Sequence, residues 1–236
     1  MTHTLHRFRI AVKPSSECKG SEASSSEPAV PNDFITMVMA CQGFNQQNAE
    51  VELRQILKLL EKHEPVNLAD DNWGGIYTGE TVDGIMEKMI DTAYIAAVFE
   101  DPRALVAALR DLKDADLGMS VVVTGDPGQI WPLIREAGLA VHTINVSLGV
   151  FGNPAEMLPE PVLALTTMCG HGLISPAFAR DVARRVAAGR LDPRDGALEL
   201  ASLCTCGMFN VASAEKILAA GALSTDEAEN QGGMVS

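Results

Sequence analysis

The sequence predicts an α/β fold: a small, mostly parallel sheet flanked by helices, with a helical C-terminal segment that contributes to a shared cleft. Short, continuously apolar runs alternate with segments of helical period. A strand, helix, strand pattern near the middle of the chain indicates parallel strands joined by a right-handed crossover. The 236 residues, 47% of them apolar, suit one large domain or two small lobes, and we expect two lobes.

The first expected lobe comprises residues 1–115. Residues 8–12 alternate apolar and polar side chains, which is typical of a half-buried strand near a sheet edge. Residues 13–33 are rich in Ser, Glu, Pro and Gly and predict a flexible loop. The apolar run at 34–40 predicts a buried strand, and the helical spacing of apolar residues at 46–63 predicts a helix.

The remainder of this lobe is less regular. Residues 66–79 show no period and are expected to form a long loop. Residues 81–99 predict a helix, although the second half, YIAAVF, also fits a strand. A further helix is expected at 102–113, because the fixed φ of Pro102 suits a first helical turn.

The second expected lobe, residues 116–236, carries the motifs CGH and CTC. It contains the strand, helix, strand unit, with a strand at 119–124, a helix at 129–137 and a strand at 141–146. The run VLALTT at 162–167 predicts another buried strand. Helical pattern then covers three stretches, at 175–188, 195–203 and 211–220.

Composition excludes several classes of partner. The chain has 18 basic and 31 acidic residues, a formal charge of -13 that would repel a phosphate backbone, so nucleic acid is not expected to bind. No apolar run approaches the roughly 20 residues of a membrane span, and the polar start lacks a secretory signal, so a cytoplasmic protein is expected. Five cysteines are too few for a disulfide scaffold, which predicts reduced thiols.

Four of these thiols are expected to meet at one site. Cys41 and Cys169 each follow a predicted buried strand, where open α/β sheets place their ligand crevices. Cys204 and Cys206 lie in a Gly-containing turn between two predicted helices. Thiolates ligate iron-sulfur clusters, so the four cysteines predict a cluster, most simply 4Fe-4S.

Two other interpretations of the cysteines stay open. A zinc site would use Cys204, Cys206, Cys169 and either Cys41 or His171, because zinc accepts all-thiolate sets and sets with one imidazole. The thiols also fit simple core packing, since cysteine is among the most often buried residue types.

Four neighbouring residues complete the expected site. His171, between two glycines, suits a general acid or base, or a fourth ligand. Gly125, Ser147 and Gly149 lie in small-residue turns after two predicted parallel strands, where free backbone N–H groups can bind a small anionic molecule.

Three functions follow as hypotheses. The first is an iron-sulfur enzyme, a lyase of anaerobic metabolism, whose cluster is held by three cysteines and acts as a Lewis acid in dehydration, elimination or carbon-sulfur cleavage. The second is an electron-transfer or accessory iron-sulfur protein that serves a larger redox enzyme. The third is a zinc-stabilised binding protein. A homo-oligomer or a redox partner protein is compatible with each.

Overall fold

The computed structural model describes residues 33–145 and 157–221, and these contain one five-stranded sheet and eight helices. The strand order is β3-β2-β4-β1-β5, and every neighbouring pair is antiparallel. The strands are β1 (Phe34–Met39), β2 (Asn67–Asp70), β3 (Gly74–Gly75), β4 (Tyr94–Phe99) and β5 (Ser120–Thr124). The expectation of a mostly parallel sheet was therefore wrong.

The connections between successive strands explain why neighbouring strands are antiparallel. β4 and β5 both pair antiparallel with β1, so they run in the same direction, but β1 lies between them. In the same way β1 and β2 run in the same direction with β4 between them. Each strand, helix, strand segment skips one place in the sheet, and a strand of opposite direction fills that place.

The expected parallel unit in the second lobe is also corrected. β5 and the following helix α4 form as predicted, but residues 141–145 adopt no regular structure and pair with no strand of the described chain. Among the described strands, β5 therefore lies at an edge of the sheet.

Eight helices surround the sheet. They are α1 (Glu50–Glu61), α2 (Val82–Lys88), α3 (Pro102–Ala115), α4 (Pro127–Glu136), α5 (Glu160–Thr166), α6 (Pro176–Ala187), α7 (Pro193–Ala201) and α8 (Val211–Ala219). Side-chain caps begin several of them: Ser175 accepts from the backbone N–H of Phe178, and Asp101 accepts from that of Arg103. Each cap precedes a proline in the first helical turn, the position that proline tolerates best.

Three segments differ in type from the sequence prediction. The expected loop at 66–79 contains β2 and β3. The expected helix at 81–99 is a short helix, α2, followed by strand β4 at YIAAVF. The expected strand at 162–167 is helix α5, because a short apolar run fits a buried helix as well as a buried strand.

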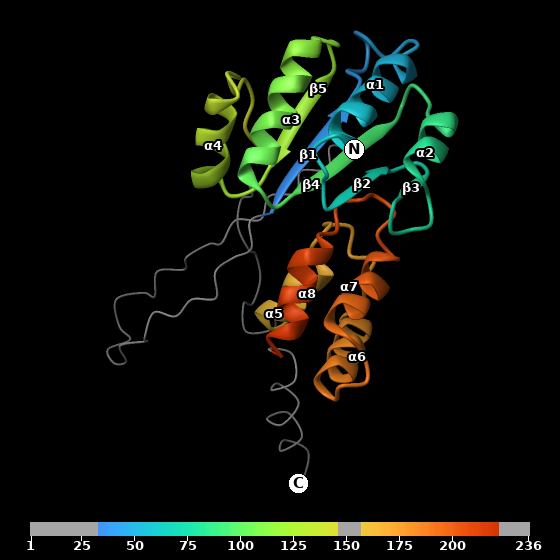
Figure 1. The fold of residues 1–236 in the computed structure, drawn as a ribbon, viewed down its shortest axis with the longest axis vertical. Helices are drawn as coiled ribbons and strands as arrows, with labels where there is room; N and C mark the ends of the chain where they lie inside the picture. Colours follow the sequence, from blue (N-terminus) through green and yellow to red (C-terminus); the bar gives the residue numbers. More distant parts are fainter. Residues whose placement is uncertain (1–32, 146–156, 222–236) are drawn as a thin grey trace.

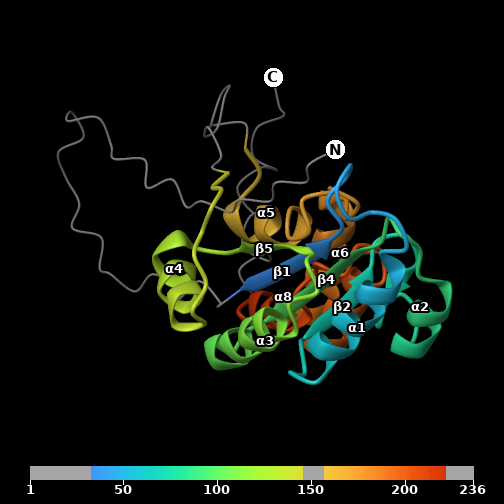
Figure 2. The same cartoon turned by 90° about the horizontal axis from the view of Figure 1, so that it is seen from above.

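The two faces of the sheet carry different helices. Alternate residues of β1 divide between two cores: Phe34 and Val38 pack with α1 to α4, whereas Ile35 and Met37 pack with α5 to α8. Figure 1 shows the four C-terminal helices grouped together below the sheet, and Figure 2 shows α1 and α3 on the opposite side from α5 and α6. The N-terminal and C-terminal halves of the chain thus cover opposite faces.

The structure does not describe the two most N-terminal segments that the sequence analysis considered. The strand at 8–12 and the loop at 13–33 lie outside the described residues. In the part of the chain that is described, no helix has the length and apolar character that a membrane crossing requires.

A buried carboxyl group lies at the end of β2. Asp70 is fully buried, and its Oδ1 accepts hydrogen bonds from the backbone N–H and the side-chain amide of Asn72. Its Oδ2 has no hydrogen-bond partner among the described residues. Burial raises the pKa of this carboxyl group above its ordinary value, because the charged form loses hydration.

The raised pKa predicts a pH dependence of stability. Because the native pKa of Asp70 exceeds the unfolded one, its stabilising contribution is complete below the unfolded pKa and is lost as pH rises through the native pKa. We expect Asp70→Asn to gain stability relative to the wild type as pH rises from about 4 to about 8, as measured by denaturant unfolding. Asp114→Asn, at an exposed position of α3, is the control. An identical pH profile for Asp70→Asn and the wild type would contradict the prediction.

Candidate metal centre

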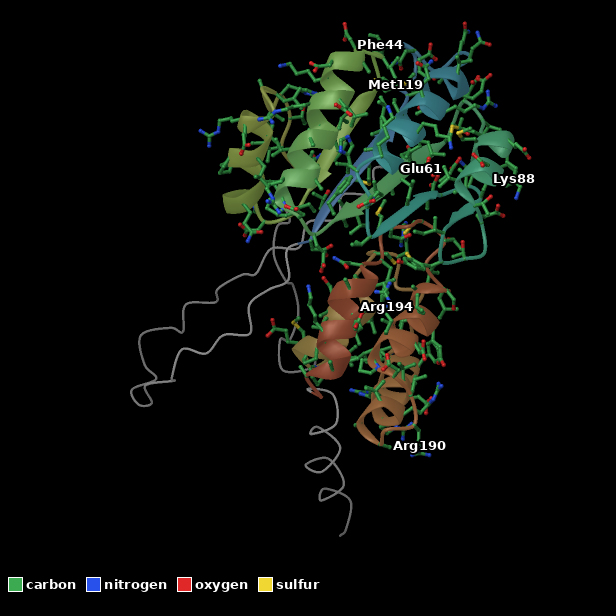
Figure 3. All side chains as sticks on the ribbon, viewed as in Figure 1. Phe44, Glu61, Lys88, Met119, Arg190 and Arg194 are labelled. Atoms are coloured by element: carbon green, nitrogen blue, oxygen red, sulfur yellow. The ribbon has the colours of Figure 1, made fainter. Side chains whose placement is uncertain are left out.

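Three ligand-type side chains converge between the sheet and the C-terminal helices. Each of Cys169, His171 and Cys206 offers one ligand atom, and these three atoms lie within 4.8 Å of one another. The Sγ of Cys204 lies 3.4 Å from the Sγ of Cys206, so a third thiol adjoins the group. Sulfur atoms are visible at this junction in Figure 3. The three thiols are buried and His171 is exposed.

Cys169 and His171 come from the turn that follows α5. The chain leaves the helix at Thr167, and the backbone N–H of Gly170 donates to the carbonyl of Thr167 at 2.9 Å. Gly170 and Gly172, on either side of His171, have φ values of 77° and 67°, a left-handed conformation that side chains disfavour. These two glycines let the chain turn sharply enough for Cys169 and His171 to face the same point.

Cys204 and Cys206 come from the loop between α7 and α8, which lies directly against β2. Gly207 has a φ of 69°, and a methyl group on its Cα would overlap the Cβ of Ala69. Only glycine satisfies both constraints, so the loop approaches the sheet as closely as two backbones allow. The same contact places Cys206 under the sheet.

Hydrogen bonds hold this loop to its two neighbours. The side-chain amide of Asn67 on β2 donates to the carbonyl of Phe209 at 2.9 Å, and both residues are fully buried. The backbone N–H of Asn210 approaches the Sδ of Met168 at 3.2 Å, next to Cys169. The side chain of Asn210 also accepts from the N–H of Ser213 and so caps α8. The loop thereby joins β2, α8 and the Cys169 turn.

The pKa values of the three thiols are shifted in opposite directions. Hydrogen bonds from the thiols of Cys204 and Cys206 lower the pKa of Cys169 to about 2, and the backbone N–H of His171 acts in the same direction. The pKa of Cys204 is raised to about 11, and that of Cys206 is also raised, first because each donates to Cys169. The hydrogen bonds among the thiols therefore favour the thiolate form on Cys169 and the protonated form on the other two cysteines.

The spacing of the ligand atoms fits one metal ion. Tetrahedral zinc with Zn–S bonds of about 2.3 Å holds its sulfur ligands about 3.8 Å apart. The 3.4 Å between the Sγ atoms of Cys204 and Cys206, and the spacing of no more than 4.8 Å among the ligand atoms of Cys169, His171 and Cys206, are compatible with this value. Thiolates that bind different irons of a four-iron cube must lie farther apart than ligands of one ion.

The structure brings together part of the set that the sequence suggested. Cys169 and Cys206 lie in the group with His171, and Cys204 adjoins it. Cys41 is exposed in the turn after β1, where its backbone N–H donates to Asn45, and it is not a member of the group. Cys169 follows a helix, not the strand that the sequence analysis expected.

The expected substrate-binding residues are divided. Gly125 lines a cavity beside β5, whereas Ser147 and Gly149 lie outside the described residues.

This cavity adjoins the metal-ligand group. It has a volume of about 1000 Å³, runs along β5 with lining residues from both faces of the sheet, and includes Cys206, His171 and Met208 in its lining. Met37 and Val122 contribute apolar lining from the sheet face that packs against α5 to α8. A cavity of this size is typical of a small-molecule site.

Three polar residues of the cavity were not expected as site residues. Asp71, Tyr94 and Ser120 line it from the sheet side. Tyr94 and Ser120 both pair with Met39, and the N–H of Asp71 donates to the carbonyl of Tyr94, so these residues form one row across the strand ends. Their positions depend on strand pairing between distant segments, for which the sequence has no local signal.

The fold and the site define a class: an antiparallel α/β protein with a Cys and His group at the wall of a cavity, able to bind a metal ion. Comparisons with protein-family models, with curated proteins and with solved structures found no significant match.

The contact between Gly207 and β2 generates a stability prediction. Gly207→Ala should lower the free energy of unfolding by about 2–4 kcal/mol, because it combines left-handed strain with overlap against Ala69. Gly189→Ala is a matched control, since Gly189 has a φ of 66° and open space around its Cα. That variant should lose only about 1–2 kcal/mol. Equal losses in the two variants, measured by denaturant unfolding, would contradict the proposed close approach.

Proposed function

We propose that this protein binds a single zinc ion through Cys169, Cys204, Cys206 and His171, and that the ion serves as a Lewis acid for a small molecule in the adjoining cavity. The observation that carries the proposal is the convergence of Cys169, His171 and Cys206 within 4.8 Å, with Cys204 in contact. Three thiolates and one imidazole are a common zinc ligand set.

The surroundings favour a catalytic ion over a purely structural one. Structural zinc sites are closed, whereas catalytic sites keep one position for water or substrate. Here Cys206 and His171 line the cavity, and His171 is the exposed ligand. Exchange of His171 for a substrate oxygen would open that position while the three buried thiolates retain the ion. A bound ion would polarise a substrate carbonyl or hydroxyl group, which suits dehydration or elimination.

An iron-sulfur cluster held by three cysteines is the second candidate. It is supported by the contact of three buried thiols while Cys41 stands apart, because a cluster with three cysteine ligands keeps one iron open for substrate. The close spacing of Cys204 and Cys206 weighs against it, since two ligands of a four-iron cube bind different irons.

Metal analysis of the full chain tests the proposal. Protein purified without oxygen should contain about one zinc ion per chain and be colourless. Ser substitution at Cys169, Cys204 or Cys206 should abolish most of the bound zinc, while Cys41→Ser, the matched control, should retain it. A brown protein that contains iron and acid-labile sulfide would support the second candidate, and full zinc retention in all three Ser variants would contradict the proposed ligand set.

One further variant tests whether His171 is a ligand of the ion. His171→Ala should leave zinc bound by three thiolates but weaken its affinity by about tenfold or more. Competition with a chromogenic chelator measures this affinity, and circular dichroism checks that the variant is folded. Unchanged affinity would remove His171 from the ligand set and leave it as an acid or base beside the ion.

A further inference from the structure

We infer that Cys204 and Cys206 are a site of reversible oxidation: hydrogen peroxide that enters the adjoining cavity joins their sulfur atoms in a disulfide, which removes two ligands from the metal centre. The bond itself depends only on the positions of the two cysteines. The release of the metal rests on the proposed function, because it requires the zinc ion that these thiolates would hold.

The two sulfur atoms already lie in contact. The Sγ of Cys204 is 3.4 Å from the Sγ of Cys206. A disulfide bond is about 2.05 Å long, so the two atoms must approach one another by roughly 1.4 Å. Thr205, between them, is exposed while both cysteines are buried, so the two side chains point to the same side of the loop. The sulfur atoms can therefore meet without the intervening backbone in their way.

The loop that carries the pair is held in place without Cys169. The backbone N–H of Cys204 donates to the carbonyl of Ala201 at 2.9 Å, at the end of α7. On the other side of the pair, Gly207 packs against β2. Both partners of the bond thus belong to one anchored segment. Cys169 lies in the separate turn after α5, so a bond to it would require two segments to move together.

The cavity gives a small oxidant access to one of the two sulfurs. Among the cysteines of the described residues, Cys206 alone lines the cavity of about 1000 Å³. His171, which is exposed, lines the same cavity, so solvent reaches the space beside Cys206. Hydrogen peroxide is little larger than water and fits this space. Cys206 is therefore the sulfur that peroxide attacks first, and Cys204 is the partner that completes the bond.

Two displacements account for every atom and electron. The sulfur of Cys206 attacks one peroxide oxygen, the O–O bond breaks, and the departing hydroxide takes a proton from solvent to become water. Cys206 is then a sulfenic acid. The sulfur of Cys204 attacks the sulfur of Cys206, the S–O bond breaks, and a second hydroxide leaves and takes up a proton. The two sulfurs together lose two electrons, and one peroxide is reduced to two water molecules.

The disulfide would end metal binding. The thiolate is the form of cysteine that binds metal, so oxidation removes Cys204 and Cys206 from the ligand set. Cys169 and His171 remain, and two ligands do not complete the four that zinc requires. Reduction by an external thiol restores the two cysteines through thiol–disulfide exchange. The centre would thus lose its Lewis acid in the presence of peroxide and regain it after reduction.

Peptide mapping of the oxidised full chain tests the bond. The protein is treated with an equimolar amount of hydrogen peroxide, alkylated and cleaved with trypsin. Cleavage after Arg194 and Lys216 places Cys204 and Cys206 in one peptide that excludes Cys169. We expect this peptide to be unalkylated and two hydrogens lighter than its reduced form, and dithiothreitol to reverse the change. A bond that links it to the Cys169 peptide, sulfinic acid in place of the bond, or full alkylation of both cysteines would overturn the inference.

Variants then assign the roles of the three thiols, with circular dichroism to show that each is folded. Cys169→Ser should still form the bond, because Cys169 is not a partner in it, and Cys41→Ser is the matched control. Cys206→Ser should form no bond and give no dimedone adduct at Cys204, because peroxide reaches Cys206 first. Loss of the bond in folded Cys169→Ser, or a dimedone adduct at Cys204 in Cys206→Ser, would overturn the inferred order of attack and pairing.

Zinc release, measured with a chromogenic chelator on the same samples, separates this inference from the proposed function. A zinc-loaded chain should release about one zinc ion for each disulfide formed. A chain that binds no zinc but forms the bond between Cys204 and Cys206 would refute the metal proposal and retain the oxidation site. A chain that binds zinc and forms no such bond, or that forms it and keeps the ion, would refute the inference and retain the metal centre.

Discussion

The close approach of the Cys204–Asn210 loop to β2 is the constraint on which the rest of the site depends. Gly207 lets the two backbones meet at Ala69, and Asn67 fixes the loop through the carbonyl of Phe209. Because the same loop contacts Met168, it also sets the distance between Cys206 and Cys169. A shift of this loop would separate the thiols from one another and from the cavity at once.

The antiparallel strand order explains why the metal-ligand group lies under a face of the sheet. It does not lie beyond the carboxyl ends of the strands. In an open parallel sheet, ligands bind in the crevice beyond the carboxyl ends of the strands. Here neighbouring strands are antiparallel, so the carboxyl ends of successive strands alternate between the two opposite ends of the strands. The face that packs against α5 to α8 provides the common surface instead, and the metal ligands approach it from the C-terminal helices.

Local signals allowed much of the secondary structure to be predicted, but not the arrangement of the strands. Strand β1 and helices α3 and α6 follow from apolar periodicity, caps and first-turn prolines. α5 was mistaken for a strand because a six-residue apolar run has no period that distinguishes the two. The type of ligand was readable from Cys169, His171 and Cys206, whereas the row through Tyr94 depends on pairing between segments distant along the chain.

The strand order also bears on how the chain reaches its native state. β1, the first described strand, pairs with β4 and β5, which follow it by more than fifty residues, and the amide of Asn210 donates to the carboxylate of Asp33 at 3.2 Å. Contacts of such long sequence separation form slowly. Cys204 and Cys206 lie near the end of the described residues, so during synthesis the thiols can become neighbours only after almost the whole described chain has left the ribosome.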